Sequence, residues 1–262
     1  MNVIRFSRMG RTMMEEIFSK ETDCVQRITT GITNLDNLIQ GGFPKNSITL
    51  ISGSPGAGKS IFCFHFLYEG VKNNEKVLYL TLDKQEEGLI FEAKNLGFNF
   101  KDAIEQGTAK FRYLDINQKM IYESMSEEIL NGEYDRIVLD SITPLSELPM
   151  YLRNPDYTPP NYSIVNAKKA SSSHTPQRKH LRYIMNALET SGATSVVTSE
   201  LQLGSTELSR DGISEFLADG VITLSYDTTM DRRKLSIVKM RNTKHSLKPQ
   251  NIAITDNGIT LQ

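Results

Sequence analysis

Apolar and polar residues alternate in blocks over most of this chain, and the alternation predicts its architecture. Short apolar runs that predict buried strands occur at 47–52, 76–83, 110–115, 136–141 and 194–200. The apolar spacing of helices occurs between these runs, at 86–95, 119–130 and 178–190. Strands that alternate with helices form βαβ units. The sequence therefore predicts an α/β fold with a mostly parallel, twisted sheet flanked by helices.

The pattern changes after residue 219. Strand-like segments at 221–226, 234–240 and 251–260 follow one another with only short polar turns, at 231–233 and 256–258. Closely spaced strands of this kind pair as antiparallel neighbours. We therefore expect antiparallel strands to extend the C-terminal edge of the sheet.

Two segments fall outside this pattern. Residues 1–28 mix irregularly spaced apolar residues with charges, which suits a loosely attached helix or an arm that docks on a partner or on a neighbouring subunit. Residues 149–177, rich in proline and serine, predict a long loop inserted into a domain spanning 29–262. Its tyrosines and lysines allow a solvated loop, a protein-docking loop or a contact with single-stranded nucleic acid.

Composition narrows the function classes. The chain has 262 residues and a formal net charge of −1, which argues against a polycation that coats nucleic acid and favours a solvated loop at 149–177. Its two cysteines, Cys24 and Cys63, are too few for a disulfide framework or a zinc site. No apolar run is long enough to span a bilayer, and the N-terminal segment does not have the pattern of a secretory signal. These features predict a cytoplasmic protein without a membrane anchor.

The most informative chemistry lies directly after the first buried strand. Residues 53–60 read Gly-Ser-Pro-Gly-Ala-Gly-Lys-Ser, the complete spacing of a phosphate-binding loop that opens a helix. The residues expected to cradle phosphate are Gly53, Ser54, Pro55, Gly56, Ala57, Gly58, Lys59, Ser60 and Ile61. Lys59 is expected to reach the β- and γ-phosphates, and Ser60 to bind Mg²⁺. The sequence thus predicts a site for a nucleoside triphosphate with its Mg²⁺ ion.

A second carboxylate completes the predicted metal site. The apolar strand near 136–141 ends in Asp140 and Ser141. An acidic residue at this point is the expected partner of Ser60 around Mg²⁺. The alternative is that Asp140 only caps its strand.

Several longer motifs resemble one family. The segments Thr30–Pro44, Leu208–Asp219, Lys239–His245 and Ile254–Ile259, together with Asp140-Ser141, are similar to the KaiC-like branch of the RecA superfamily. The resemblance covers about 28–262 without the insertion and implies a single RecA-like domain.

That resemblance implies a homo-oligomeric ring, hexameric by analogy, that holds ATP between neighbouring subunits. Residues that it places near the nucleotide from the adjacent subunit are Lys239, Met240, Arg241, Thr243, His245, Thr255 and Asp256. Lys239 and Arg241 would complete the catalytic site, because an arginine supplied in trans neutralises charge that develops on the γ-phosphate. The alternative places both cations on the solvent face of an edge strand.

This chain departs from the family at the catalytic base. Family members carry glutamate, often as a pair, where this chain has Asp83 followed by Lys84. We take Asp83 as the candidate base and Glu200 as a candidate γ-phosphate sensor. The shorter side chain predicts slow hydrolysis, since a misplacement near 1 Å costs about 10²-fold in rate. A regulatory or assembly switch is therefore the favoured function, with a non-hydrolysing scaffold and a RecA-type DNA-repair ATPase as alternatives.

Overall fold

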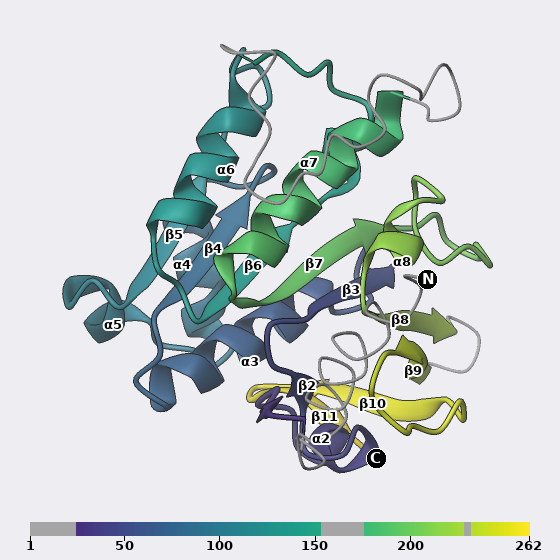
Figure 1. Cartoon of the computed structure of the whole chain (residues 1–262). Helices are drawn as coiled ribbons and strands as arrows, with labels where there is room; N and C mark the ends of the chain where they lie inside the picture. The colour runs from purple at the N-terminus through teal and green to yellow at the C-terminus, as the bar shows by residue number, and fades with distance from the viewer. Residues whose placement is uncertain (1–24, 153–175, 228–231) are drawn as a thin grey trace, which may run out of the picture.

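A nine-stranded sheet forms the centre of the protein in this computed structural model, which describes residues 25–152, 176–227 and 232–262 (Figure 1). Its strand order is β11-β10-β9-β8-β3-β7-β6-β4-β5. The strands are β3 (Ile48–Gly53), β4 (Val77–Thr81), β5 (Ala109–Tyr113), β6 (Arg136–Asp140), β7 (Thr194–Glu200), β8 (Gly220–Asp227), β9 (Arg232–Met240), β10 (Gln250–Thr255) and β11 (Gly258–Leu261).

The six strands from β8 to β5 are parallel, and β9, β10 and β11 are antiparallel to their neighbours. The predicted α/β fold is therefore confirmed. One detail differs, because β8 pairs in parallel with β3, whereas residues 221–226 were expected to be antiparallel. The reason is the connection over residues 201–219, which returns the chain to the amino end of the sheet. There Asp219 donates its N–H to Ile48 O at 2.8 Å.

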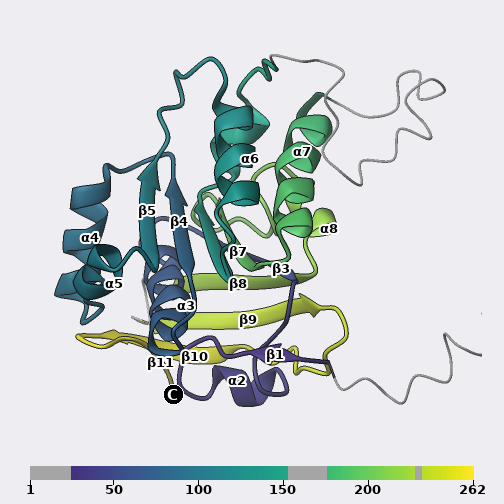
Figure 2. The same cartoon turned by 60° about the vertical axis from the view of Figure 1, so that its left-hand side comes forward.

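Helices cover both faces of the sheet (Figure 2). One face carries α3 (Lys59–Lys72), α4 (Glu86–Asn95) and α5 (Lys101–Glu105), and the other carries α6 (Ile121–Asn131) and α7 (Pro176–Ser191). The predicted helix at 86–95 has the observed bounds of α4, and those of α6 and α7 lie within two residues of the prediction. Short elements were not predicted: α2 (Leu35–Leu38), the 3-10 turn η1 (Thr143–Ser146), α8 (Ser214–Leu217), and a small sheet of β1 (Arg27–Ile28) and β2 (Phe43–Pro44).

Alternate residues of the parallel strands enter two separate cores. In β4, Val77 and Tyr79 face the core beneath α3, and Leu78 and Leu80 face the core beneath α6 and α7. Burial on both faces explains why these strands read as continuous apolar runs. It also means that a polar side chain on either face lies in a dry environment and needs a partner.

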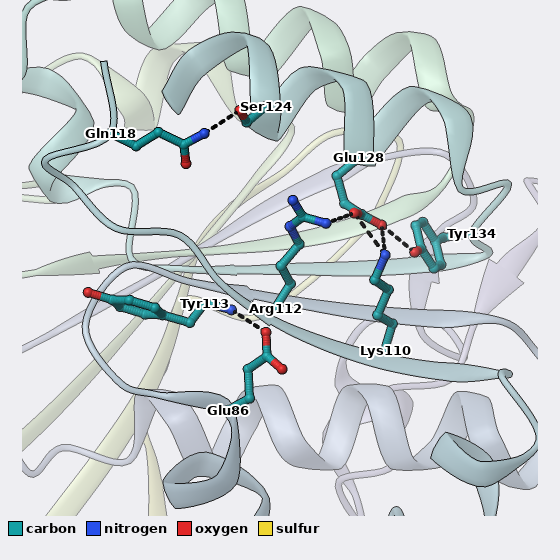
Figure 3. A network of polar contacts seen from close by, with 8 residues as sticks. All are labelled: Glu86, Lys110, Arg112, Tyr113, Gln118, Ser124, Glu128 and Tyr134. Carbon is teal, nitrogen blue, oxygen red and sulfur yellow. Dashed lines mark hydrogen bonds and ion pairs between the residues drawn. The ribbon is translucent and has the colours of Figure 1, made fainter. Parts of the chain in front are cut away.

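Ion pairs join the outer edge strand β5 to α6 (Figure 3). Glu128 of α6 binds Lys110 at 2.8 Å and Arg112 at 2.8 Å, and it accepts the Tyr134 hydroxyl. Charged side chains on an edge strand discourage pairing with another chain. Because β7, β6 and β4 separate β5 from β3, this network is not part of the phosphate-loop site.

The two unusual segments are described only at their ends. Residues 1–24 and 153–175 lie outside the described part of the chain, so the predicted roles of the arm and of the insertion stay predictions. Arg27 and Ile28, which the sequence assigned to the arm, form β1. Arg27 Nη1 also donates to Thr243 Oγ1 at 2.5 Å.

Candidate nucleotide-binding site

The phosphate loop joins the central strand β3 to α3, and two of its glycines are required by local geometry. A Cβ at Gly53 would lie 2.5 Å from Leu224 O of the neighbouring strand β8, so no larger residue fits there. Gly58 precedes α3 with φ 107°, a left-handed conformation that favours glycine. Because Gly58 provides no capping side chain, the first N–H groups of α3 are available to an anion.

Lys59 and Ser60 begin α3 and point to different parts of the site. Lys59 Nζ donates to Gly53 O at 2.9 Å and to Ser54 O at 3.2 Å, which holds the ammonium over the phosphate loop. Ser60 Oγ donates to Asp140 Oδ2 at 2.8 Å. The structure therefore brings together the hydroxyl and the carboxylate that the sequence assigned to magnesium. Oxygen ligands of this type suit Mg²⁺.

Two further hydroxyls meet the same carboxylate, and the sequence analysis missed both. Tyr79 of β4 donates to Asp140 Oδ2 at 2.6 Å, and Thr198 of β7 donates to Oδ1 at 2.5 Å. β4 and β7 are the two strands beside β6, so their side chains on the α3 face converge on its end. The available signal was a hydroxyl residue inside each buried run, but β4 and β7 each contain other hydroxyl residues, so the signal has meaning only once the strand order is known.

The candidate base lies beside this cluster. Asp83 follows β4 by two residues, and its side chain is exposed. Surrounding protein removes part of its solvation and, with the charges of Glu200 and Asp140, raises the pKa of Asp83 to about 6. Lys59 and Lys84 act in the opposite direction. The structure thus gathers Asp83, Glu200, Asp140 and Lys59 at the carboxyl end of the sheet.

Two residues that follow Asp83, Lys84 and Glu86, have other partners. Glu86 begins α4 and accepts the main-chain N–H of Tyr113 at 3.1 Å. Lys84, which stands where the family has a second glutamate, pairs with Glu92 at 2.5 Å. Asp83 therefore remains the candidate base of this stretch.

Lys239 and Arg241 lie at the other end of the sheet from the chain's own phosphate loop. Strand pairing places Lys239 opposite Val221 and Met240 opposite Gly220, and Gly220 is level with Thr49 at the start of β3. Gly53, where the phosphate loop begins, is four residues farther along β3, or about 13 Å. The two predicted cations cannot reach their own phosphate loop.

Each of these cations has a partner at the amino end. Lys239 Nζ donates to Glu215 O at 3.0 Å and to Ala218 O at 2.6 Å, and burial together with the charge of Arg241 lowers the pKa of Lys239. Arg241 forms an ion pair with Asp219 at 2.9 Å. β10 pairs with β9 only at residues 233–235, but Lys239 is half-buried and main-chain oxygens bind its ammonium, so it is not a freely solvated cation.

The remaining predicted contacts fall into two places. Thr243 lies near Arg241, whose carbonyl oxygen accepts its hydroxyl at 3.1 Å, and His245 follows it as a half-buried residue. Thr255 and Asp256 instead form the exposed turn between β10 and β11. This hairpin packs on α3 of the same chain, where Ile259 donates its N–H to His65 Nε2 at 2.8 Å.

Comparison with known proteins shows the family of this chain. A family model described as "ATPase: KaiC" matches residues 28–155 and 163–262. The chain belongs to the KaiC ATPase family. The crystal structure of a KaiC-like protein from Pyrococcus horikoshii superimposes with a TM-score of 0.73 at 28% identity, covering 91% of this chain and 100% of that one.

Two kinds of curated relative resemble this member of the KaiC family. A UPF0273 protein of Methanocaldococcus jannaschii is 29% identical, over 90% of this chain and 96% of its own length. The circadian clock protein KaiC3 of Synechocystis is 27% identical over 87% of this chain, which spans 44% of the relative.

Family membership supports ATP binding and ATPase activity in general. The residues present fit Mg-ATP, because the uncapped start of α3 suits phosphate and the Ser60–Asp140 pair suits a magnesium ion.

Among the described residues, no helix is long and apolar enough to cross a membrane.

Proposed function

We propose that this KaiC-family protein binds Mg-ATP between the subunits of a homo-oligomeric ring, hexameric by analogy, and hydrolyses it slowly as a regulatory or assembly switch. One observation carries the proposal. The phosphate loop and the Lys239–Arg241 pair lie at opposite ends of the same sheet. A subunit can supply the phosphate loop of one site and the cations of the next, but not both parts of a single site.

The phosphate side of each site comes from one chain. Main-chain N–H groups of residues 53–61 and the ammonium of Lys59 would bind the phosphates, and Ser60 with Asp140 would hold magnesium. When bound, the magnesium ion neutralises charge on the phosphate oxygens. Asp83 would orient the attacking water, since its carboxylate lies near Asp140 and Glu200, whose charges together with burial raise its pKa to about 6.

The other side comes from the neighbouring subunit. Lys239 and Arg241 would meet the phosphates there, with Met240, Thr243 and His245 near the nucleotide. Thr255 and Asp256 were predicted on this side too, but their hairpin packs on α3, so they would lie near the phosphate loop of their own chain. To meet the phosphates, Lys239 must exchange the carbonyl oxygens of Glu215 and Ala218 for phosphate, and Arg241 must exchange Asp219. Both exchanges replace polar partners with a more highly charged one, so assembly and nucleotide binding support each other.

Oligomer size with and without nucleotide tests the ring. Size-exclusion chromatography with light scattering should give a hexamer in saturating Mg-ATP, and calorimetry should detect the nucleotide. Lys59→Ala should abolish the heat of binding, whereas Lys72→Ala, on the exposed end of the same helix, should preserve it. A monomer under both conditions would refute the shared site.

A non-hydrolysing scaffold is the second candidate, and the Asp83-Lys84 pair favours it. Two substitutions separate the candidates. A slow ATPase should lose its remaining activity in Asp83→Asn and gain activity in Asp83→Glu, because the longer side chain restores the reach of the usual base. A scaffold should show no phosphate release in the unmodified protein or in Asp83→Asn.

A further inference from the structure

The Asp140 carboxylate accepts hydroxyl hydrogen bonds on both of its oxygens. Ser60 at 2.8 Å and Tyr79 at 2.6 Å donate to Oδ2, and Thr198 at 2.5 Å donates to Oδ1. The donors come from α3, β4 and β7, three elements that surround the end of β6 (Figure 1). Only Ser60 belongs to a recognisable nucleotide-binding motif.

The Tyr79 side chain is fixed by its surroundings. It is fully buried. Its ring stacks on that of Phe111 with centroids 5.4 Å apart, and it packs against the ring of Phe64 of α3 with centroids 5.7 Å apart. Burial and the charge of Asp140 raise the pKa of Tyr79 well above its ordinary value, so the hydroxyl remains a donor. A rigid ring therefore holds one O–H in a constant direction against Oδ2.

An aspartate needs such support because its own torsion does not fix it. Rotation of a carboxylate about its last bond is broad and roughly two-fold, unlike the staggered torsions of aliphatic side chains. The hydrogen bonds must therefore set the orientation of the Asp140 oxygens. Tyr79 and Ser60 share Oδ2, so the tyrosine fixes the oxygen that faces the serine hydroxyl.

We propose that Tyr79 is a positioning residue for magnesium in the nucleotide site, acting through Asp140. The inference rests on the proposed Mg-ATP function and adds to it a residue outside the phosphate loop and its acidic partner. Loss of a hydrogen-bond partner behind a metal ligand typically costs 10- to 100-fold in metal affinity. Tyr79→Phe deletes the hydroxyl and keeps the buried ring. We therefore expect the affinity of the nucleotide site for Mg²⁺ to fall about tenfold.

Calorimetric titration with ADP at a series of Mg²⁺ concentrations tests this without relying on turnover. In Tyr79→Phe the Mg²⁺ concentration for half-maximal enhancement should rise about tenfold, and ADP affinity without Mg²⁺ should not change. The matched control is Tyr122→Phe, which removes another fully buried hydroxyl, bound to Leu145 O on the opposite face. It should leave the Mg²⁺ dependence unchanged.

A second pair of variants protects the test against misfolding. Thr198→Val removes the donor to Oδ1 and should also raise the Mg²⁺ concentration needed for half-maximal enhancement. Thr198→Ser keeps a hydroxyl, so its Mg²⁺ requirement should be that of the unmodified protein. Equal shifts in Tyr79→Phe and Tyr122→Phe, or no shift in Tyr79→Phe, would overturn the positioning role. Absence of Mg²⁺-dependent ADP binding in the unmodified protein would instead overturn the proposed function.

Discussion

The shared site can be tested by dividing it between two inactive subunits. Lys59→Ala removes the ammonium from the phosphate loop, and Arg241→Ala removes a cation from the opposite end of the sheet. Arg241→Ala alone should lower the ATPase rate by on the order of 10³, the effect of losing an arginine supplied in trans. It should preserve the fold, because the exposed ion pair with Asp219 contributes at most about 1 kcal/mol.

The expected recovery follows from the strand positions. Arg241 is level with Ile48, five residues before Gly53, so it is separated from the end of β3 by about 17 Å along the strands and by two strand spacings, about 10 Å, across the sheet. Each site must therefore combine two subunits. In an equal mixture, half of the phosphate loops and half of the cations are intact, so about one quarter of the sites are complete.

Co-expression of the two variants with different tags, followed by purification through both tags, provides the mixed rings. Phosphate release should recover to about one quarter of the unmodified rate. In the control, Lys234→Ala takes the place of Arg241→Ala; Lys234 is an exposed cation of β9, the strand that precedes Arg241. These rings should give about half of the unmodified rate, because only Lys59→Ala then removes sites. Mixed rings no more active than either variant alone would refute a site shared between subunits.

Three further predictions concern single residues. The ATPase rate should fall as the pH drops below about 6, because Asp83 must be ionised to act as a base; a rate that stays constant as the pH falls through 6 would contradict the role. Burial lowers the pKa of His65 from 6.5 to about 4, so the unfolded chain binds the additional proton. Stability should therefore decrease by about 3 kcal/mol as the pH falls from 6.5 to 4, measured by urea unfolding, and His65→Gln should lose this slope; an unchanged slope would assign it to other groups. Gly53→Ala should destabilise the fold by about 1–3 kcal/mol, since its Cβ would overlap the β8 backbone, whereas Gly88→Ala in open space on α4 should raise the melting temperature slightly; equal melting curves would contradict the packing argument.

Features that depend on neighbours in the chain were predictable from the amino-acid sequence. The phosphate loop follows from covalent spacing, because the glycines, Lys59 and Ser60 must share one turn between a strand and a helix. The pattern of apolar residues likewise predicted α4, α6, α7 and the parallel strands other than β8. Asp140 was found because it ends an apolar run, a local signal.

The partners of these residues depend on strand order, and only the tertiary structure decided them. Tyr79 and Thr198 meet Asp140 because β4 and β7 flank β6, an arrangement that no local pattern encodes. The parallel direction of β8 depends on where the preceding connection re-enters the sheet. Local spacing thus determined which groups bind phosphate, whereas long-range strand pairing decided which hydroxyls hold the carboxylate and put Lys239 and Arg241 out of reach of their own phosphate loop.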